Sequence, residues 1–304
     1  MASALHEAVR LEMIAGAMNV VQAVGLPRPL HSTRLERAVG SARVSVRAGD
    51  ASTGRRNRLA ELFQSGAAKI RLPRVGPADP VEAVLLNTAG GLTGGDRLAF
   101  AVSVEEGAAC TATTQAAERI YRRVTGFAEV ETTLSVAAGA RLDWIPQETI
   151  VFNRSGLARR LEADVDPSAS LLAVESVVLG RAAMGETVDR TFVRDAWRIR
   201  RGGRLVFADT ARIDGDAAGL MAGPATGGPA TAFATLLLVA PDAEEQLDRA
   251  RAALADVPVE AGASAWNGIL VARMLAAGGQ PLRAALVRLI ESLRGVPMPR
   301  VWSC

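Results

Sequence analysis

The sequence predicts a mainly β protein with a few α-helices, chiefly near its C-terminus. Two observations support this prediction. Hydrophobic and polar residues alternate from about residue 41 to residue 240, and glycine-containing turns interrupt the alternation at short intervals. Hydrophobic spacing typical of helices is found after residue 240. With 304 residues and 49% hydrophobic content, the chain can also bury a sizeable core.

The N-terminal residues do not share the alternating pattern. Residues 1–40 are predicted to form a variable extension that is either disordered or helical, since Leu5, Val9 and Met13 have helical spacing. Charged and amide residues interrupt the continuous apolar core that a signal peptide needs. The folded domain is therefore predicted to span residues 41–304.

Two segments show the strand pattern most clearly. Alternate residues of Arg97–Val104 are apolar and would share one face of a strand. Trp197–Arg200 and Leu205–Phe207 form a second pair, and Gly202-Gly203 between them predicts a tight hairpin. Most of the region up to residue 240 is therefore expected to be sheet.

A different pattern begins after a stretch rich in glycine, alanine and proline, Ala217–Thr231, which is predicted to be a flexible loop. Asp242 is expected to cap a helix over Ala243–Asp256, and Pro281 occupies a first-turn position of a second helix that ends at Arg294. The apolar stripe of this second helix comprises Leu282, Leu286, Leu289 and Leu293. This spacing predicts that one helix face docks on the sheet.

Charge and composition argue against a nucleic-acid binder. The net charge is only +3, and the 4 Trp, 1 Tyr and 7 Phe do not interleave with basic clusters, although the pI is 9.4. Lys69 is the only lysine, so nearly all basic residues are arginines. Because the guanidinium fork matches carboxylates, we expect partners with mildly acidic protein surfaces.

The cysteines and the hydropathy pattern point to a cytoplasmic protein. Cys110 and Cys304 lie far apart and form neither a disulfide framework nor a Cys-x-x-Cys pair, which fits a reducing compartment. No run approaches the roughly 20 apolar residues that span a membrane. We therefore expect no membrane partner.

A glycine-rich segment, Asn87–Arg97, follows an apolar run and resembles a phosphate-binding loop in the spacing of Gly90 and Gly95. Asp96 and Arg97 stand where such a loop needs lysine followed by serine or threonine, and the acidic side chain would repel phosphate. A strand pattern follows the segment, so no helix N-terminus is available to hold an anion. We interpret the segment as a bend between two strands, while a phosphate-containing ligand remains the alternative.

Common catalytic arrangements are not supported. His6 and His31 are the only histidines and both precede the folded pattern, so a Ser-His-Asp or Cys-His site has no suitable base. Gly262–Trp266 lacks the closing glycine of a nucleophile elbow. Without clustered histidines or cysteines, tight binding of zinc or nickel is not expected. We predict a protein that is not an enzyme and has no tightly bound cofactor.

Carboxylates within apolar strand patterns are the most conspicuous candidate site residues. Alternation places Glu175 on the strand face of Leu171 and Val177, and the same parity places Glu148 with Trp144 and Ile150. One interpretation is that each glutamate pairs with an arginine, Arg181 being the candidate partner of Glu175. The alternative is a wet internal cavity whose carboxylates pass a divalent ion while binding it weakly.

These segments also carry a family resemblance. Leu62–Arg74, Asn87–Leu98, Thr113–Arg122, Trp144–Phe152 and Leu179–Glu186 occur in the order of the signature motifs of UreD urease accessory proteins, called UreH in some lineages. Several long motifs in the same order are more specific than a single glycine pattern. The chain therefore resembles the UreD family over roughly residues 41–304, and residues 1–40 depart from the family pattern.

The resemblance implies a fold of stacked, helically wound strands and a role as a urease maturation chaperone. It further implies a complex with UreF and the GTPase UreG on the urease apoprotein, with the metallochaperone UreE involved indirectly. GTP would then belong to UreG, and a nickel ion would be in transit. Under this hypothesis Glu148, Glu175 and Glu186 are the candidate residues of a nickel path.

Overall fold

The computed structural model of the chain describes residues 36–49, 54, 56–181 and 184–303. The chain divides into Met1–Glu36 and Arg37–Cys304, and only the second unit is described below. The first strand begins at Val39, two residues before the predicted domain boundary. The predicted N-terminal extension otherwise lies almost entirely outside the described residues.

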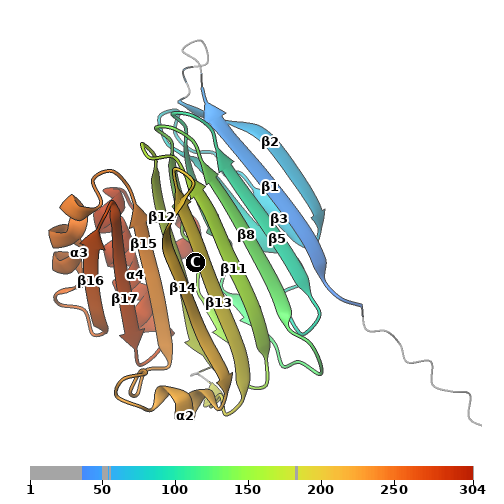
Figure 1. The fold of residues 1–304 in the computed structure, drawn as a ribbon. Coiled ribbons are helices and arrows are strands. Elements are labelled where there is room, and N and C mark those ends of the chain that lie inside the picture. The colour runs from blue at the N-terminus through green and yellow to red at the C-terminus, as the bar shows by residue number, and fades with distance from the viewer. Residues whose placement is uncertain (1–35, 50–53, 55, 182–183, 304) are drawn as a thin grey trace, which may run out of the picture. The chain divides into compact units, whose positions relative to one another are not determined.

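Two large sheets make up the second unit (Figure 1). The seven-stranded sheet has the order β14 (Arg204–Gly215), β13 (Thr191–Arg201), β11 (Gly156–Val165), β8 (Ala128–Val136), β5 (Arg97–Val104), β1 (Val39–Ala48), β2 (Asn57–Gly66). The main path of the ten-stranded sheet is β16 (Glu260–Trp266), β17 (Ile269–Ala276), β15 (Ala232–Val239), β12 (Ser170–Leu179), β9 (Arg141–Trp144), β6 (Ala109–Thr114), β4 (Val81–Asn87), β3 (Ala68–Arg71). The short strands β7 (Glu118–Ile120) and β10 (Thr149–Val151) pair with each other, and β10 also pairs with β12.

The chain winds between these sheets. It passes from β4 to β5, from β6 to β8, from β9 to β11 and from β12 to β13, and each of these strands pairs in parallel with its counterpart in the next coil. This arrangement makes about four turns of a solenoid-like stack. The predicted mainly β fold of helically wound strands is confirmed.

Alternation along the strands explains the core between the sheets. Inward residues of the first sheet, such as Val102 and Leu134, share one buried cluster with Leu142 and Leu171 of the second sheet. The residues of β5 that were predicted to share one face, including Leu98 and Val102, lie in or against this cluster. The two-residue hairpin between β13 and β14 also forms at Gly202 and Gly203, whose φ angles of 54° and 77° suit glycine.

The helices α3 (Leu247–Leu254) and α4 (Gly279–Arg294) cover the outer face of the second sheet. The other helical elements within the described ranges are α2 (Ala217–Met221) and the 3-10 turns η3 (Glu244–Gln246) and η4 (Arg300–Ser303). Leu282, Leu286 and Leu289 of α4 pack in a second buried cluster with β15 and β17, and Leu293 packs against it. The predicted helix with Pro281 in its first turn, docked on the sheet, is confirmed.

Three local predictions need correction. Ala217–Thr231 is not merely a flexible loop, because it begins with α2, which buries Ala217 and Met221. Asp242 does not cap a helix over Ala243–Asp256. The turn starts as η3, and the Asp242 carboxylate accepts a hydrogen bond from the Gln246 amide instead.

The third correction concerns Trp144–Phe152, which is not one strand. β9 ends at Trp144 and β10 begins at Thr149. Pro146 lies between them and has no backbone N–H to continue a ladder, so the alternation cannot be carried through this segment.

The C-terminal segment is fastened across the outer face of the second sheet. Arg294, at the end of α4, forms an ion pair of 2.8 Å with Asp143 of β9, and its side chain also hydrogen-bonds Thr111 of β6. Trp302 donates from its indole N–H to the Thr113 hydroxyl at 2.9 Å. These contacts join residues more than 150 positions apart and fix the segment to two successive coils.

Candidate functional site

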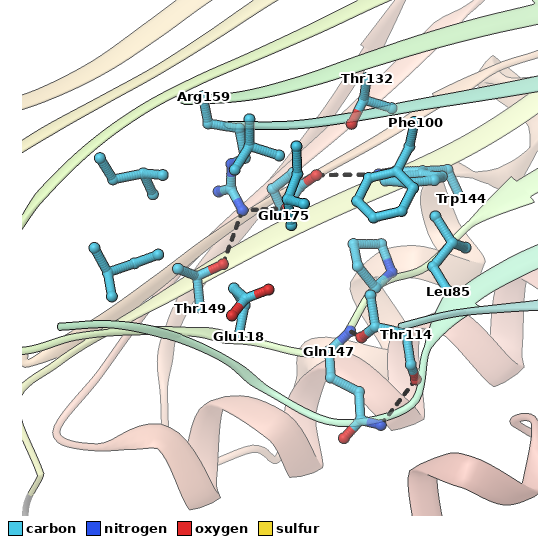
Figure 2. A pocket seen from close by; sticks show the side chains of 15 residues that line it. Leu85, Phe100, Thr114, Glu118, Thr132, Trp144, Gln147, Thr149, Arg159 and Glu175 are labelled. Carbon is cyan, nitrogen blue, oxygen red and sulfur yellow. Dashed lines mark hydrogen bonds and ion pairs between the residues drawn. The ribbon is translucent and has the colours of Figure 1, made fainter. Parts of the chain in front are cut away.

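A small cavity of ≈ 60 Å³ lies in the core between the two sheets (Figure 2). Its apolar wall includes Leu85, Phe100 and Trp144. Its polar lining comprises Thr114, Glu118, Thr132, Gln147, Thr149, Arg159 and Glu175. A space of this size with several polar groups can hold a few water molecules.

Arg159 is the centre of the polar wall. Its Nε and Nη2 donate to the two carboxylate oxygens of Asp195 at 3.1 and 2.6 Å, while Nη1 lies 2.5 Å from Oε2 of Glu175. Nη1 also donates to the Thr149 hydroxyl at 3.0 Å. The Trp144 indole donates to the other Glu175 oxygen at 3.0 Å. All five side chains are therefore held in fixed positions.

Strand register explains how these residues meet. Arg159 on β11 lies directly beside Asp195 on β13, because these strands are parallel neighbours in the first sheet. Glu175 comes from β12 and Trp144 from β9, which pair in the second sheet. The cluster thus joins inward-pointing residues of both sheets.

The cluster has two carboxylates for one guanidinium. Burial, together with the negative charge of Asp195, raises the pKa of Glu175 to about 7, although Arg159 and the Trp144 indole act in the opposite direction. Burial lowers the pKa of Arg159, but the two carboxylates outweigh this effect and raise it, so Arg159 stays charged. The raised pKa favours the protonated form of Glu175 more than in a solvent-exposed glutamate, whereas Arg159 keeps its charge.

Glu118 adds a second acidic side chain to the cavity wall. Burial raises its pKa above the ordinary value, while hydrogen bonds from the Arg119 backbone N–H and the Asn87 amide act against this rise. The Asn87 amide lies 3.1 and 3.2 Å from the two carboxylate oxygens. Figure 2 shows Glu118 and Glu175 on the wall of the same cavity.

Comparison with known proteins identifies the family. A family model described as "UreD urease accessory protein" matches residues 39–303. The chain belongs to the UreD family. It is 51% identical over 278 residues to "Urease accessory protein UreD 2" of Methylorubrum populi, covering 91% of this chain and 93% of the relative. It is also 50% identical over 272 residues to "Urease accessory protein UreD" of Rhizobium leguminosarum bv. trifolii, covering 89% and 97%.

Of the three candidate acidic residues in this UreD-family chain, Glu175 occupies the predicted position. It is 5% exposed and shares the inward face of β12 with Leu171 and Val177. The prediction that Arg181 pairs with Glu175 is wrong, because Glu175 pairs with Arg159. Arg181 instead pairs with Glu186 at 2.8 Å.

Glu148 does not share the inward face with Trp144. It lies between β9 and β10, and its side chain forms an ion pair of 2.8 Å with Arg283 of α4. The parity prediction fails because Pro146 interrupts the strand, as described above. Glu148 therefore contributes to the contact between the coils and α4 and does not line the cavity.

Glu186 also lies outside the cavity. Its carboxylate accepts hydrogen bonds from the backbone N–H groups of Asn153 and Arg181, and from the Arg181 guanidinium. The pKa of Glu186 is lowered, chiefly by the hydrogen bond from the Arg181 side chain and also by the backbone donors, although partial burial acts in the opposite direction. The structure thus brings only Glu175 of the three candidates to the interior site.

Sequence reasoning missed Glu118, Arg159 and Asp195. Arg159 lies two residues from both Leu157 and Leu161 on the same strand, so it faces the core with them. This spacing could have identified Arg159 as a charged residue that points inward. Asp195 shows the same signal between Val193 and Trp197. Glu118 lies on a three-residue strand, which is too short to show a period.

The glycine-rich segment forms a bend between β4 and β5, as interpreted from the sequence. The buried carboxylate of Asp96 accepts hydrogen bonds from the backbone N–H groups of Ala38 and Thr93 at 2.9 and 2.7 Å. Gly91 has φ 145°, and a Cβ there would lie 2.2 Å from the Tyr121 ring. The Asp96 carboxylate therefore stabilises the turn by binding backbone N–H groups, and the Tyr121 ring packs closely against it.

Two further features bear on metals and membranes. Among the described residues, no group of three or more His, Cys, Asp or Glu side chains is arranged to hold a metal ion. No helix in the described part of the chain is long and apolar enough to cross a membrane.

Proposed function

We propose that this chain is a cytoplasmic scaffold of urease maturation and that its interior cavity forms part of a route for nickel into the urease apoprotein. Membership of the UreD family supports the maturation role. The observation that supports the nickel route is the surplus of carboxylates over guanidinium at a cavity with room for water. The chain itself is not an enzyme under this proposal and holds no resident cofactor.

The chemistry of the cavity suits transit better than storage. Carboxylate oxygens and water are ligands that a borderline divalent ion accepts, and both Glu118 and Glu175 present such oxygens. An arriving cation would displace the proton of Glu175, whose pKa is raised. The fixed positive charge of Arg159, 2.5 Å from Glu175, opposes long residence of the cation. A weakly held, hydrated ion is therefore expected.

The partners follow from the family resemblance. We propose a complex with UreF, the GTPase UreG and the urease apoprotein subunits, with UreE supplying nickel indirectly. In this complex GTP is bound by UreG. The buried Asp96 in the glycine-rich bend supports this division of roles, because its charge would repel a phosphate at that position.

A urease activation assay with defined components tests the scaffold role. Omission of this chain should abolish activation, and the tagged chain should co-purify UreF together with urease subunits. Isothermal titration of GTP into the isolated chain should give no binding. Undiminished activation without the chain would contradict the proposal, and tight GTP binding would favour a nucleotide-dependent activity instead.

A further inference from the structure

Arg123, Arg154 and Arg190 lie beside one another at equivalent turns of three successive coils, where the chain passes from the second sheet to the first. The backbone N–H of Arg123 donates to the carbonyl oxygen of Arg154 at 3.0 Å, and the N–H of Arg154 donates to that of Arg190 at 2.6 Å. Each arginine therefore belongs to a different coil, at the inter-strand spacing of about 4.8 Å. We call these three residues the arginine column.

The arginine column lacks acidic partners within the described parts of the chain. The Arg123 guanidinium donates to two backbone carbonyl oxygens, those of Ser155 and Gly126, and lies 4.6 Å over the Phe127 ring. No ion pair joins Arg154 or Arg190 to a described carboxylate, and both residues are exposed. Like charges repel at this spacing, and an anionic partner would remove the repulsion.

A broad concavity of ≈ 740 Å³ surrounds the arginine column. Its lining also includes Arg122, Val124, Asp189 and Asp214. Val124 is 85% exposed and places one apolar side chain among these charged ones. None of these lining residues belongs to the wall of the interior cavity.

The backbone conformation of Arg154 is an independent indication that its side chain serves in binding. Its φ is 60°, in the left-handed region that glycine adopts readily and that other residues adopt at a cost. Glycine would be the favoured residue for this turn. Strain of this kind is often found where a side chain serves binding.

We propose that the concavity around the arginine column binds an acidic segment of a protein partner. Arginine forks pair with carboxylates in two-point geometry, and Val124 offers an apolar contact beside them. Asp189 and Asp214 disfavour a uniformly anionic polymer such as a nucleic acid, whereas a protein segment with mixed charges can complement them. This inference goes beyond the proposed function and does not depend on nickel transit.

The test uses the full-length chain and a fluorescent peptide in which glutamates outnumber a few interspersed lysines, with binding followed by anisotropy at low ionic strength. The wild-type chain should bind the peptide, and added salt should weaken binding. Arg154→Gly should weaken binding about fivefold, and Arg154→Gly with Arg190→Gln more than about tenfold. Because glycine suits φ 60°, the Arg154→Gly chain should keep its melting temperature, which separates lost binding from misfolding.

Arg47→Gln is the matched control, because it removes the same charge from an exposed position on β1, separated from β13 by β11, β8 and β5. It should leave peptide binding unchanged. Wild-type binding that is absent, or that is equal in the Arg154 variants, would overturn the proposal. Tighter binding of inorganic polyphosphate, lost in the same variants, would also overturn it by assigning the surface to a phosphate polymer.

Discussion

Two buried charged clusters differ in their balance of charge. The cavity cluster has two carboxylates, Glu175 and Asp195, for the single guanidinium of Arg159. The cluster beneath the end of α4 has one carboxylate, Asp143, which contacts Arg294 at 2.8 Å and Arg141 at 3.3 Å. The second arrangement neutralises its only acid and fastens a helix, as expected of a structural contact.

The surplus of acid in the first cluster has a different consequence. It leaves one carboxylate whose pKa is raised to about 7 beside a cavity, and such perturbed groups are typical of functional sites. Both clusters are buried, so burial alone does not separate them. They differ in the ratio of acids to guanidinium groups and in the cavity beside Glu175, and the proposed nickel route depends on these two differences.

The largest expected effect is that of Arg159→Gln. This change leaves two buried carboxylates close together without a cation, which should cost on the order of 3–5 kcal/mol of unfolding free energy. The measurement is chemical denaturation of the variant and of the Arg159→Gln, Glu175→Gln double variant. The double variant should recover part of the loss, because the second change removes the surplus charge. An unaltered stability of the single variant would contradict this account of the cluster.

A smaller loss is expected for Arg294→Gln. Asp143 then keeps Arg141, whose side chain is 43% exposed, so the cost should be about 2 kcal/mol. Release of the C-terminal segment should appear as faster hydrogen exchange in residues 296–303. Arg288→Gln on an exposed position of α4 is the control and should leave exchange unchanged. Equal exchange in both variants would show that the Asp143 contact does not fasten the segment.

The pH dependence of stability should distinguish Glu175 from the other acids. Its folded pKa of about 7 exceeds the ordinary value of 4.5, so the folded state binds more protons than the unfolded state between these values. The corresponding stability is present below pH 4.5 and is lost as pH rises toward 7, by on the order of 3 kcal/mol. The stability of wild type relative to Glu175→Gln should therefore fall across this range, as measured by melting temperature. A constant difference would refute the raised pKa.

Glu148→Gln should have the smallest effect. Its ion pair with Arg283 is partly exposed and should contribute less than about 1 kcal/mol to the free energy of unfolding. Urea denaturation should detect little change, and urease should receive its normal nickel content in the presence of this variant. A nickel deficit with Glu148→Gln would return that residue to the proposed path.

The fold was more predictable from the sequence than the site. Period-two alternation along β5 and the Gly202-Gly203 turn are local signals, and both gave the correct elements. Parity also placed Glu175 inside, because β12 is one uninterrupted strand. The parity argument was wrong for Glu148, because Pro146 separates two short strands and the alternation does not continue from one to the other.

The composition of the site depends on contacts that no local pattern contains. Arg159 and Glu175 come from different sheets, and their pairing is set by how the coils stack. Glu118 reaches the cavity from a strand of only three residues. Their association could be recognised only once the register of the coils was known.

The most direct test of the cavity's role is the nickel content of urease activated with a Glu118→Gln, Glu175→Gln double variant. Glutamine keeps the size and hydrogen-bonding groups of both side chains but removes the charges that attract a divalent ion. We predict that the variant co-purifies with UreF and urease as wild type does, while nickel per urease falls about tenfold. Normal nickel content in an intact complex would contradict the nickel route, and loss of the complex would show that the two acids are structural.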